Sequence, residues 1–279
     1  MIAAKNNLKT AFLLAALFGL LVWVGSYWGT SGMIVAGIMG VIMNFGAWFF
    51  SDKMAIAAMR GREVDERSAP ELYDMIRRLS ERAGLPMPRV YICPQEAPNA
   101  FATGRNPRHA AVAVTMGAMR LLDRDELEGV MAHELAHVKN RDTLTSAVAA
   151  TVAGIFSMLA QFAMFFGGGS NRQGGNPLAA LGMVLLGAIG AALIKAMISR
   201  SREYVADADG AKIAGSPNGL ANALQKLERY AKGIPMDNPN PAMNNMFIIE
   251  PFMGATLTNM FATHPPTERR IAALLGGQA

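Results

Sequence analysis

The sequence predicts an α-rich α+β fold in an integral membrane protein, with four transmembrane helices and a polar domain made of two stretches. Of its 279 residues, 52% are hydrophobic and only 17% are charged, whereas soluble domains carry about 25% charged residues. The mean hydropathy is +0.22. The apolar residues gather in four segments, and the stretches between them alternate helix and strand patterns. The excess of apolar residues therefore predicts burial in a bilayer.

Each of the four apolar segments has the roughly 17 to 25 residues that an α-helix needs to cross about 30 Å of hydrocarbon. The first follows Lys5 and Lys9 and resembles a secretory signal, but no small-residue cleavage site follows it. Instead the chain turns through "GTSG" into the second segment, which predicts a helical hairpin. Trp23, Trp28 and Trp48 lie near its ends, as interfacial anchors do. The segments cover residues 10–28, 33–50, 144–166 and 178–198.

Basic residues predict the orientation. They flank the polar sides of both hairpins, whereas the two connecting turns hold only Arg172. The positive-inside rule then places both termini and both polar stretches in the cytoplasm. The single cysteine, Cys93, cannot form an internal disulfide, which fits a reducing compartment. We assign the net charge of +5 to lipid headgroups and expect no nucleic-acid partner, because no Lys/Arg run is long enough to follow phosphates.

The hairpins divide the chain into four parts. Residues 1–50 and 143–198 form the two transmembrane hairpins, and residues 51–142 and 199–279 form the two parts of the polar domain. Periodicity and turn residues predict the elements of that domain. In chain order these are a helix over 68–84, strands over 88–93, 99–104 and 109–119, a helix over 121–140, a helix over 217–233 and an irregular run over 234–263.

The stretch "VMAHELAHVKNRD" carries the first chemical signal. It lies on a predicted helix that Asp123 and Glu126 begin as a capping box. His133 and His137 are four residues apart, so one helix face offers both imidazoles to a single ion. Glu134 is rotated from His133 by about 100°, near enough to polarise a metal-bound water and pass on its proton. The pattern predicts a metal site with a general base rather than two unrelated core or surface histidines.

Catalytic zinc usually takes three protein ligands, and "SRSREYVADADG" offers the third. Glu203 is the predicted ligand, and Asp207, one turn further, is predicted to hydrogen-bond a ligand imidazole. The alternative is a charged helix beside the membrane, in which Glu203 pairs with Arg200 or Arg202. The second hairpin favours the ligand interpretation, because it brings its two cytoplasmic ends side by side. We expect one Zn²⁺ per chain, although geometry and availability also decide which divalent metal binds.

Four motifs together resemble the HtpX family of bacterial membrane metalloproteases, which is related to the CaaX prenyl protease class. They are "NAFATG", "HELAHVKNRD", "REYVADADG" and "THPPTERRIAAL", and the resemblance extends over essentially the whole chain. It implies a cytoplasmic, zincin-like metalloprotease domain on a multi-pass protein of the bacterial inner membrane. It also implies an endopeptidase that hydrolyses misfolded or damaged membrane proteins, so we expect these substrates and the lipid bilayer as partners. The zinc ligands and general base that it implies are His133, His137, Glu203 and Glu134.

The resemblance also implies roles for residues outside the metal positions. Asn99 and Ala100 match an edge strand that lies beside the substrate backbone. His264 in "THPP" matches a position near the site, where it either stabilises the oxyanion or only caps the final helix. Asp142 belongs to the family pattern, and we expect a structural role for it at the end of the motif helix.

Other functions need to be separated from a quality-control protease. A narrow-specificity peptidase like the prenyl proteases would have the same site but would not cleave unfolded casein. A non-enzymatic chaperone or scaffold with a structural zinc would not need Glu134, because such a site needs no base. A transporter finds no support, because Lys195 and Gln161 are the main polar residues in the apolar segments and Lys195 can snorkel.

Overall fold

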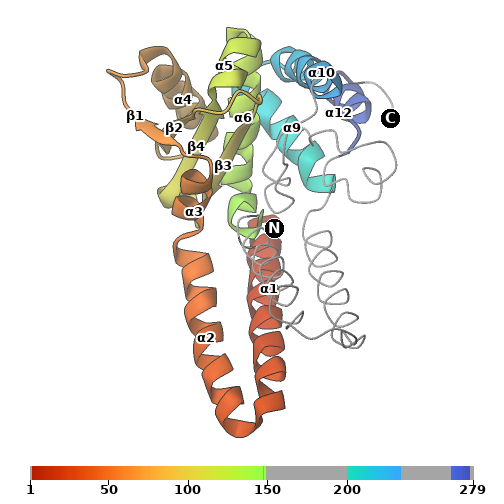
Figure 1. Ribbon diagram of the computed structural model, residues 1–279. Helices are drawn as coiled ribbons and strands as arrows, with labels where there is room; N and C mark the ends of the chain where they lie inside the picture. The colour runs from red at the N-terminus through yellow and green to blue at the C-terminus, as the bar shows by residue number, and fades with distance from the viewer. Residues whose placement is uncertain (1, 147, 149–199, 234–264, 277–279) are drawn as a thin grey trace, which may run out of the picture.

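The computed structural model describes residues 2–146, 148, 200–233 and 265–276. A four-stranded sheet and the helices packed around it form one part of the molecule, the upper part in Figure 1. A two-helix hairpin projects from this part. The sheet and its helices carry the predicted metal site, and the hairpin carries the most apolar surface.

The hairpin consists of α1 (Ile2–Gly25), η1 (Ser26–Trp28) and α2 (Gly29–Phe49), and Figure 1 shows α1 and α2 running antiparallel. One apolar stretch, Asn6–Gly46, runs through both helices with a mean hydropathy of 2.0, and it is long and apolar enough to cross a membrane. Only 24% of its most apolar window is buried within the protein. The exposed apolar side chains are therefore available to lipid.

Two glycines let the helices approach each other near the turn. A Cβ on Gly25 would lie 2.5 Å from the Cβ of Ala36, and a Cβ on Gly32 would lie 2.5 Å from the carbonyl oxygen of Gly25. Both separations are too short for non-bonded atoms, so only glycine fits. The tryptophans on this hairpin are exposed, as predicted for interfacial anchors. Their exposed fractions are 57% for Trp23, 73% for Trp28 and 38% for Trp48.

Several predictions concern residues that the structure does not describe. The third apolar segment is described only at residues 144–146 and 148. The fourth, 178–198, and the irregular run 234–263 lie outside the described residues. Within the described ranges, one apolar stretch of membrane-crossing length is found. The count of four transmembrane helices therefore stays a prediction.

A mixed sheet forms one face of the polar domain. Its strands are β1 (Arg62–Val64), β2 (Arg89–Cys93), β3 (Ala100–Gly104) and β4 (Ala110–Thr115), in the spatial order β1-β2-β4-β3. β2 and β4 are parallel, and the other two pairs are antiparallel. Every residue of β4 is buried, as expected for an interior strand covered on both faces. β3 is left as an edge strand.

Helix α6 (Arg124–Asn140) lies at the centre of the domain, between β3 and the helices α9 and α10 (Figure 1). Its side chains Val130, Met131 and Leu135 have no exposed surface. Fully burying an apolar side chain of this kind contributes about 1.5–3 kcal/mol, so α6 is firmly held. The remaining helices are α3 (Ser51–Ala58), α4 (Pro70–Ala83), η2 (Pro107–His109), α5 (Met116–Leu121), α9 (Arg200–Ala214), α10 (Asn218–Gly233) and α12 (Thr267–Leu274).

Most predicted elements of the polar domain are confirmed, as α4, β2, β3, α6 and α10. The strand predicted over 109–119 is wrong at its C-terminal end, because the strand stops at Thr115. Thr115 Oγ1 accepts a hydrogen bond from Ala118 N–H at 3.2 Å and thereby begins α5. The continuous apolar run gives no periodicity that would mark this change. The short elements α3 and β1 were not predicted.

Candidate metal centre

The motif helix α6 has a defined cap at each end. At its N-terminus Asp123 Oδ1 accepts a hydrogen bond from Glu126 N–H at 2.9 Å, and Glu126 Oε2 accepts one from Asp123 N–H at 2.9 Å. This confirms the predicted capping box. At its C-terminus Arg141 takes a left-handed conformation with φ 57°. Between these caps the helix holds His133 and His137 one turn apart on one face.

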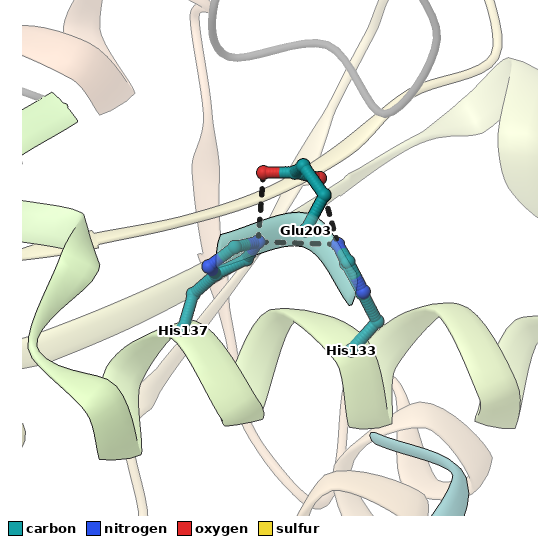
Figure 2. Close-up of side chains that lie close together, drawn as sticks. All are labelled: His133, His137 and Glu203. Carbon is teal, nitrogen blue, oxygen red and sulfur yellow. Dashed lines mark hydrogen bonds and ion pairs between the residues drawn. The ribbon is translucent and has the colours of Figure 1, made fainter. Parts of the chain in front are cut away.

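Three side chains converge beside α6, as Figure 2 shows. His133 Nε2 lies 3.1 Å from His137 Nε2 and 3.7 Å from Glu203 Oε2. His137 Nε2 lies 3.7 Å from Glu203 Oε1. Each of the three residues offers one ligand atom, and these three atoms lie within 4.8 Å of one another. The structure thus brings together the three residues that the sequence indicates as metal ligands.

Glu203 reaches the histidines because α9 packs very close to α6. The contact is made at Gly210, where a Cβ would lie 2.9 Å from His133 Cα and 3.0 Å from the backbone nitrogen of His133. A similar approach occurs between α6 and α10, where a Cβ on Gly129 would lie 2.4 Å from the backbone nitrogen of Leu220. Backbone atoms cannot move aside, so both glycines set the spacing of the helices around the site.

A buried ion pair supports His133. Asp207 places Oδ1 2.9 Å from His133 Nδ1. Arg270 of α12 donates to Asp207 from Nε at 2.9 Å and from Nη2 at 2.6 Å, and the two side chains are 1% and 2% exposed. Burial alone would raise the pKa of Asp207, but the hydrogen bonds and positive charges of Arg270 and His133 together outweigh it and lower this pKa from its usual value. This two-point contact with Arg270 fixes the orientation of the Asp207 carboxylate and keeps it ionised.

A second carboxylate, Asp142, contacts the other histidine. Its Oδ2 lies 3.2 Å from His137 Nδ1. Asp142 reaches back to the helix because Arg141 turns the chain through its left-handed conformation. Arg202 of α9 places Nη1 3.5 Å from Asp142 Oδ1. Asp142 therefore lies at the end of the motif helix, as predicted, and also orients a predicted ligand.

The electrostatic field of the site favours a cation. Burial alone would lower the pKa of His137. Its hydrogen bond to Asp142 and the negative charges of Glu203, Glu134 and Asp142 act in the opposite direction and together outweigh burial. Together they raise the pKa of His137 from 6.5 to about 9. The same negative charges favour a metal cation, which would bind in exchange for that proton.

The donor set fits zinc. With Nδ1 of each ring beside its carboxylate, each neutral imidazole offers one lone pair at Nε2, and the two Nε2 atoms lie 3.1 Å apart. Two lone pairs and a carboxylate aimed at one point repel each other unless a cation lies between them. Two imidazoles and one carboxylate, with a fourth position left open, are a known ligand set of catalytic zinc. The described residues therefore fit the metal that the motif predicts.

Glu134 connects the ligands to the edge of the sheet. It follows His133 on α6 and is 7% exposed. Its Oε2 accepts a hydrogen bond from the N–H of Ala102, in β3, at 2.9 Å. The strand thereby orients the carboxylate, and Glu134 is not one of the three converging ligands.

The residues expected to bind substrate lie where the edge strand begins. Ala100 is the first residue of β3, Asn99 precedes it, and each is 1% exposed. The backbone of Asn99 is joined to Thr115: its N–H donates to Thr115 Oγ1 at 2.8 Å, and its carbonyl accepts from Thr115 N–H at 2.9 Å. Ala102, two residues further, is the strand residue that contacts Glu134. His264 lies outside the described residues.

Three residues near the site were not predicted. Arg270 lies in "THPPTERRIAAL", where its position four residues before Leu274 places both on the packed face of α12. Gly210 ends the "REYVADADG" motif, and a glycine inside a helix signals a close approach. Ala102 contributes only its backbone N–H, so its residue type carries no signal.

Comparison with known proteins gives consistent matches. The family model described as Peptidase family M48 matches residues 66–277. A protease HtpX homologue of Paraburkholderia phytofirmans is 52% identical over 274 residues, which cover 97% of this chain and 96% of the relative. A protease HtpX homologue of Nostoc punctiforme is 53% identical over 278 residues, with the same coverage of 97% and 96%. Sequence similarity thus extends over nearly the full length of these relatives.

A solved structure is also similar. The crystal structure of Ste24p from S. mikatae matches with a TM-score of 0.53 and 18% identity. The match covers 98% of this chain and 66% of that protein. At this identity the likeness shows a shared fold alone.

Proposed function

Because this chain belongs to peptidase family M48 and is a membrane metalloprotease, we propose that it hydrolyses misfolded or damaged membrane proteins with one zinc ion per chain. His133, His137 and Glu203 are the proposed ligands, and Glu134 is the proposed general base. One observation carries the proposal: three ligand atoms converge within 4.8 Å, and the carboxylate that follows the first histidine is turned toward the edge of a sheet.

The protein's own groups then have separate tasks. Zinc, when bound, would acidify the attacking water and polarise the scissile carbonyl. Glu134, held by the N–H of Ala102, would take the proton of that water and deliver it to the leaving amine. Asp207 and Asp142 hold the two imidazoles in orientation from behind. His264 is proposed to stabilise the oxyanion.

The edge strand supports an extended peptide as substrate. Because the N–H of Ala102 points to Glu134, this side of β3 faces the proposed site. A peptide added along β3, which begins at Ala100, would be held through its backbone, and Asn99 would fix the start of that strand through its two bonds to Thr115. Backbone recognition selects for an unfolded chain rather than for particular side chains. This favours misfolded proteins over one narrow substrate.

The proposed location is the bacterial inner membrane, with both termini and the catalytic domain in the cytoplasm. The basic residues that flank the apolar segments support this orientation. The start of α1 contacts the end of α6, where the amide of Asn6 donates to the carbonyl of Asn140 at 3.0 Å. The N-terminus therefore lies at the domain end of the hairpin (Figure 1).

Casein cleavage by the full-length protein in detergent tests the activity. The protein is purified with a chelator present, which prevents self-cleavage, and is then loaded with zinc. We expect wild type to cut casein and Glu134→Gln to lose about 10²- to 10⁴-fold in rate, the usual contribution of a general base, while both bind one zinc. Glu128→Gln is the matched control, because Glu128 lies on the same helix and pairs with Arg82 instead of facing the site.

If wild type and Glu134→Gln both bind zinc but neither cleaves casein or a membrane substrate, the quality-control proposal is contradicted. A narrow-specificity peptidase or a zinc-containing scaffold would then be favoured. Equal activity in wild type and Glu134→Gln would remove Glu134 from the mechanism.

A further inference from the structure

A polar side chain of the membrane hairpin reaches the metal centre. Asn6, in the first turns of α1, is 2% exposed. Its Nδ2 donates one hydrogen bond to Asp142 Oδ1 and another to the carbonyl of Asn140, the last residue of α6, at 3.0 Å. Both hydrogens of the amide are therefore used at the end of the motif helix. The other oxygen of Asp142 contacts His137.

This contact is the first of a row on one face of α1. Thr10, one turn after Asn6, places Oγ1 2.9 Å from Thr145 Oγ1. Residues 6, 10, 13 and 17 recur at helical spacing, so α1 lies along the chain segment that follows the motif helix. The row becomes apolar further from the metal centre. There Leu13 and Leu17 of α1 form a buried cluster with Leu144 and Val148 of the facing segment.

We propose that Asn6 is a positioning residue for the metal: it holds Asp142, and Asp142 holds the imidazole of His137. The inference rests on the proposed metal function. Asn6 touches neither the ion nor the substrate and acts only through the carboxylate. The first membrane helix is then a structural part of the metal centre as well as an anchor.

The chemistry of the contact explains why an asparagine is placed there. Asp142 accepts from Nδ2 of Asn6 and lies 3.5 Å from Nη1 of Arg202. A neutral amide restrains Oδ1 without removing the negative charge that His137 uses at Oδ2. A polar residue at the edge of an apolar helix is costly unless it is paired. Asn6 is paired to the metal centre rather than within its own helix.

The test is zinc affinity of the full-length protein in detergent, measured by competition with a chelator. Asn6→Leu keeps the size of the side chain and removes both donated hydrogens. Changes in residues that orient a metal ligand typically cost about 10- to 100-fold in affinity. Asn6 acts one residue further away, so we expect a loss of about 3- to 10-fold.

Three companion variants make the test specific. Asn7→Leu is the matched control, because Asn7 is the exposed neighbour on the same helix, and it should bind zinc like wild type. Thr10→Val weakens the same row without touching Asp142, and it should also bind zinc like wild type. When Asp142→Ala is already present, adding Asn6→Leu should weaken zinc binding by less than about 2-fold, because the effects of interacting residues are not additive.

Unchanged zinc affinity in Asn6→Leu would overturn the proposal. The proposal would also be overturned if the losses of zinc affinity in Asn6→Leu and Asp142→Ala were fully additive, or if Thr10→Val lost as much affinity as Asn6→Leu. Either result would mean that Asn6 only holds the helix in place. A wild-type protein that binds no zinc would instead overturn the metal assignment itself, and this inference with it. The two failures are thus distinguishable before any protease assay.

Discussion

The two histidines of the metal centre are held by different regions of the protein. His133 contacts Asp207, which is locked by Arg270 of the C-terminal helix α12. His137 contacts Asp142, whose other oxygen accepts from Asn6 of the membrane helix α1. The first support is a buried ion pair within the polar domain. The second joins a neutral amide from the hairpin to Arg202 of α9, whose Nη1 lies 3.5 Å from Asp142 Oδ1.

The two supports differ in what it costs to remove them. An ion pair buried on both sides cannot lose one partner without leaving an unpaired charge inside the protein, so the support of His133 is also part of the fold. A neutral donor can be removed at smaller cost. The amide of Asn6 can therefore be removed while Arg202 still pairs with Asp142, and this amide connects the metal centre to the membrane hairpin. The side chain of His137 is also the more exposed of the two, 15% against 2%.

Arg270→Leu should have the largest effect, because it leaves Asp207 buried without its partner. Breaking a buried pair in this way lowers the free energy of unfolding by about 3–5 kcal/mol. Urea unfolding of the zinc-free protein measures it, with alkylation of Cys93 at pH 8 as the signal. Burial raises the pKa of Cys93 to about 11, so the folded thiol stays protonated and unreactive at pH 8, whereas the unfolded thiol, with a pKa of about 8.5, reacts.

Arg269→Leu is the control for this prediction, since Arg269 is the exposed neighbour on the same helix. We expect it to unfold at the urea concentration of wild type. An Arg270→Leu protein that is as stable as this control would mean that the ion pair is not part of the fold, and the contrast between the two supports would disappear.

The two carboxylates themselves compare the supports directly. Asp207→Asn and Asp142→Asn should each weaken zinc binding within the range of about 10- to 100-fold. Asp207→Asn should lie nearer the upper limit, because it also disturbs Arg270. Chelator competition measures both. Asp209→Asn is the control, because Asp209 contacts only Asn140 and Lys212 among the partners seen; a larger loss for Asp142→Asn than for Asp207→Asn would reverse the comparison.

Gly210→Ala should have the smallest effect and should act on the His133 side. Its Cβ would lie 2.9 Å from His133 Cα, so α9 must shift away from α6. Overpacking of this kind lowers the free energy of unfolding by about 1–3 kcal/mol. We expect a loss near the lower limit, measured by urea unfolding with Cys93 alkylation, and weaker zinc binding. Ala208→Ser, on the exposed face of α9, should change neither quantity. Normal zinc affinity in Gly210→Ala would show that the close approach does not position Glu203.

Local patterns were sufficient to predict much of the site. The spacing of His133 and His137 indicates a shared ion, and the capping box formed by Asp123 and Glu126 indicates where their helix begins. Glu203 required one topological step, the expectation that the second hairpin places its two ends side by side. The same reasoning did not predict that strand 109–119 would end at Thr115, because an apolar run has the same composition in a strand and in a buried helix.

The supports of the two histidines could not be predicted from local patterns. Asn6 is separated from Asp142 by the rest of the first hairpin and the first part of the polar domain, and nothing in its neighbourhood distinguishes it from Asn7. Arg270 and Arg269 are adjacent and identical in type, and only the packing of α12 decides which one is buried. Ala102 acts through its backbone. Such contacts depend on tertiary structure, whereas the spacing of His133 and His137 depends only on the period of one α-helix.

X-ray absorption at the zinc edge of the full-length protein tests whether His133, His137 and Glu203 bind one zinc ion. It reports the number and type of atoms bound to the metal. We expect one zinc per chain with two imidazole nitrogens at about 2.0–2.1 Å and oxygen ligands at about 2.0–2.2 Å, and a spectrum altered by the loss of the carboxylate ligand in Glu203→Ala. A sulfur ligand, or an unchanged spectrum in Glu203→Ala, would contradict this assignment.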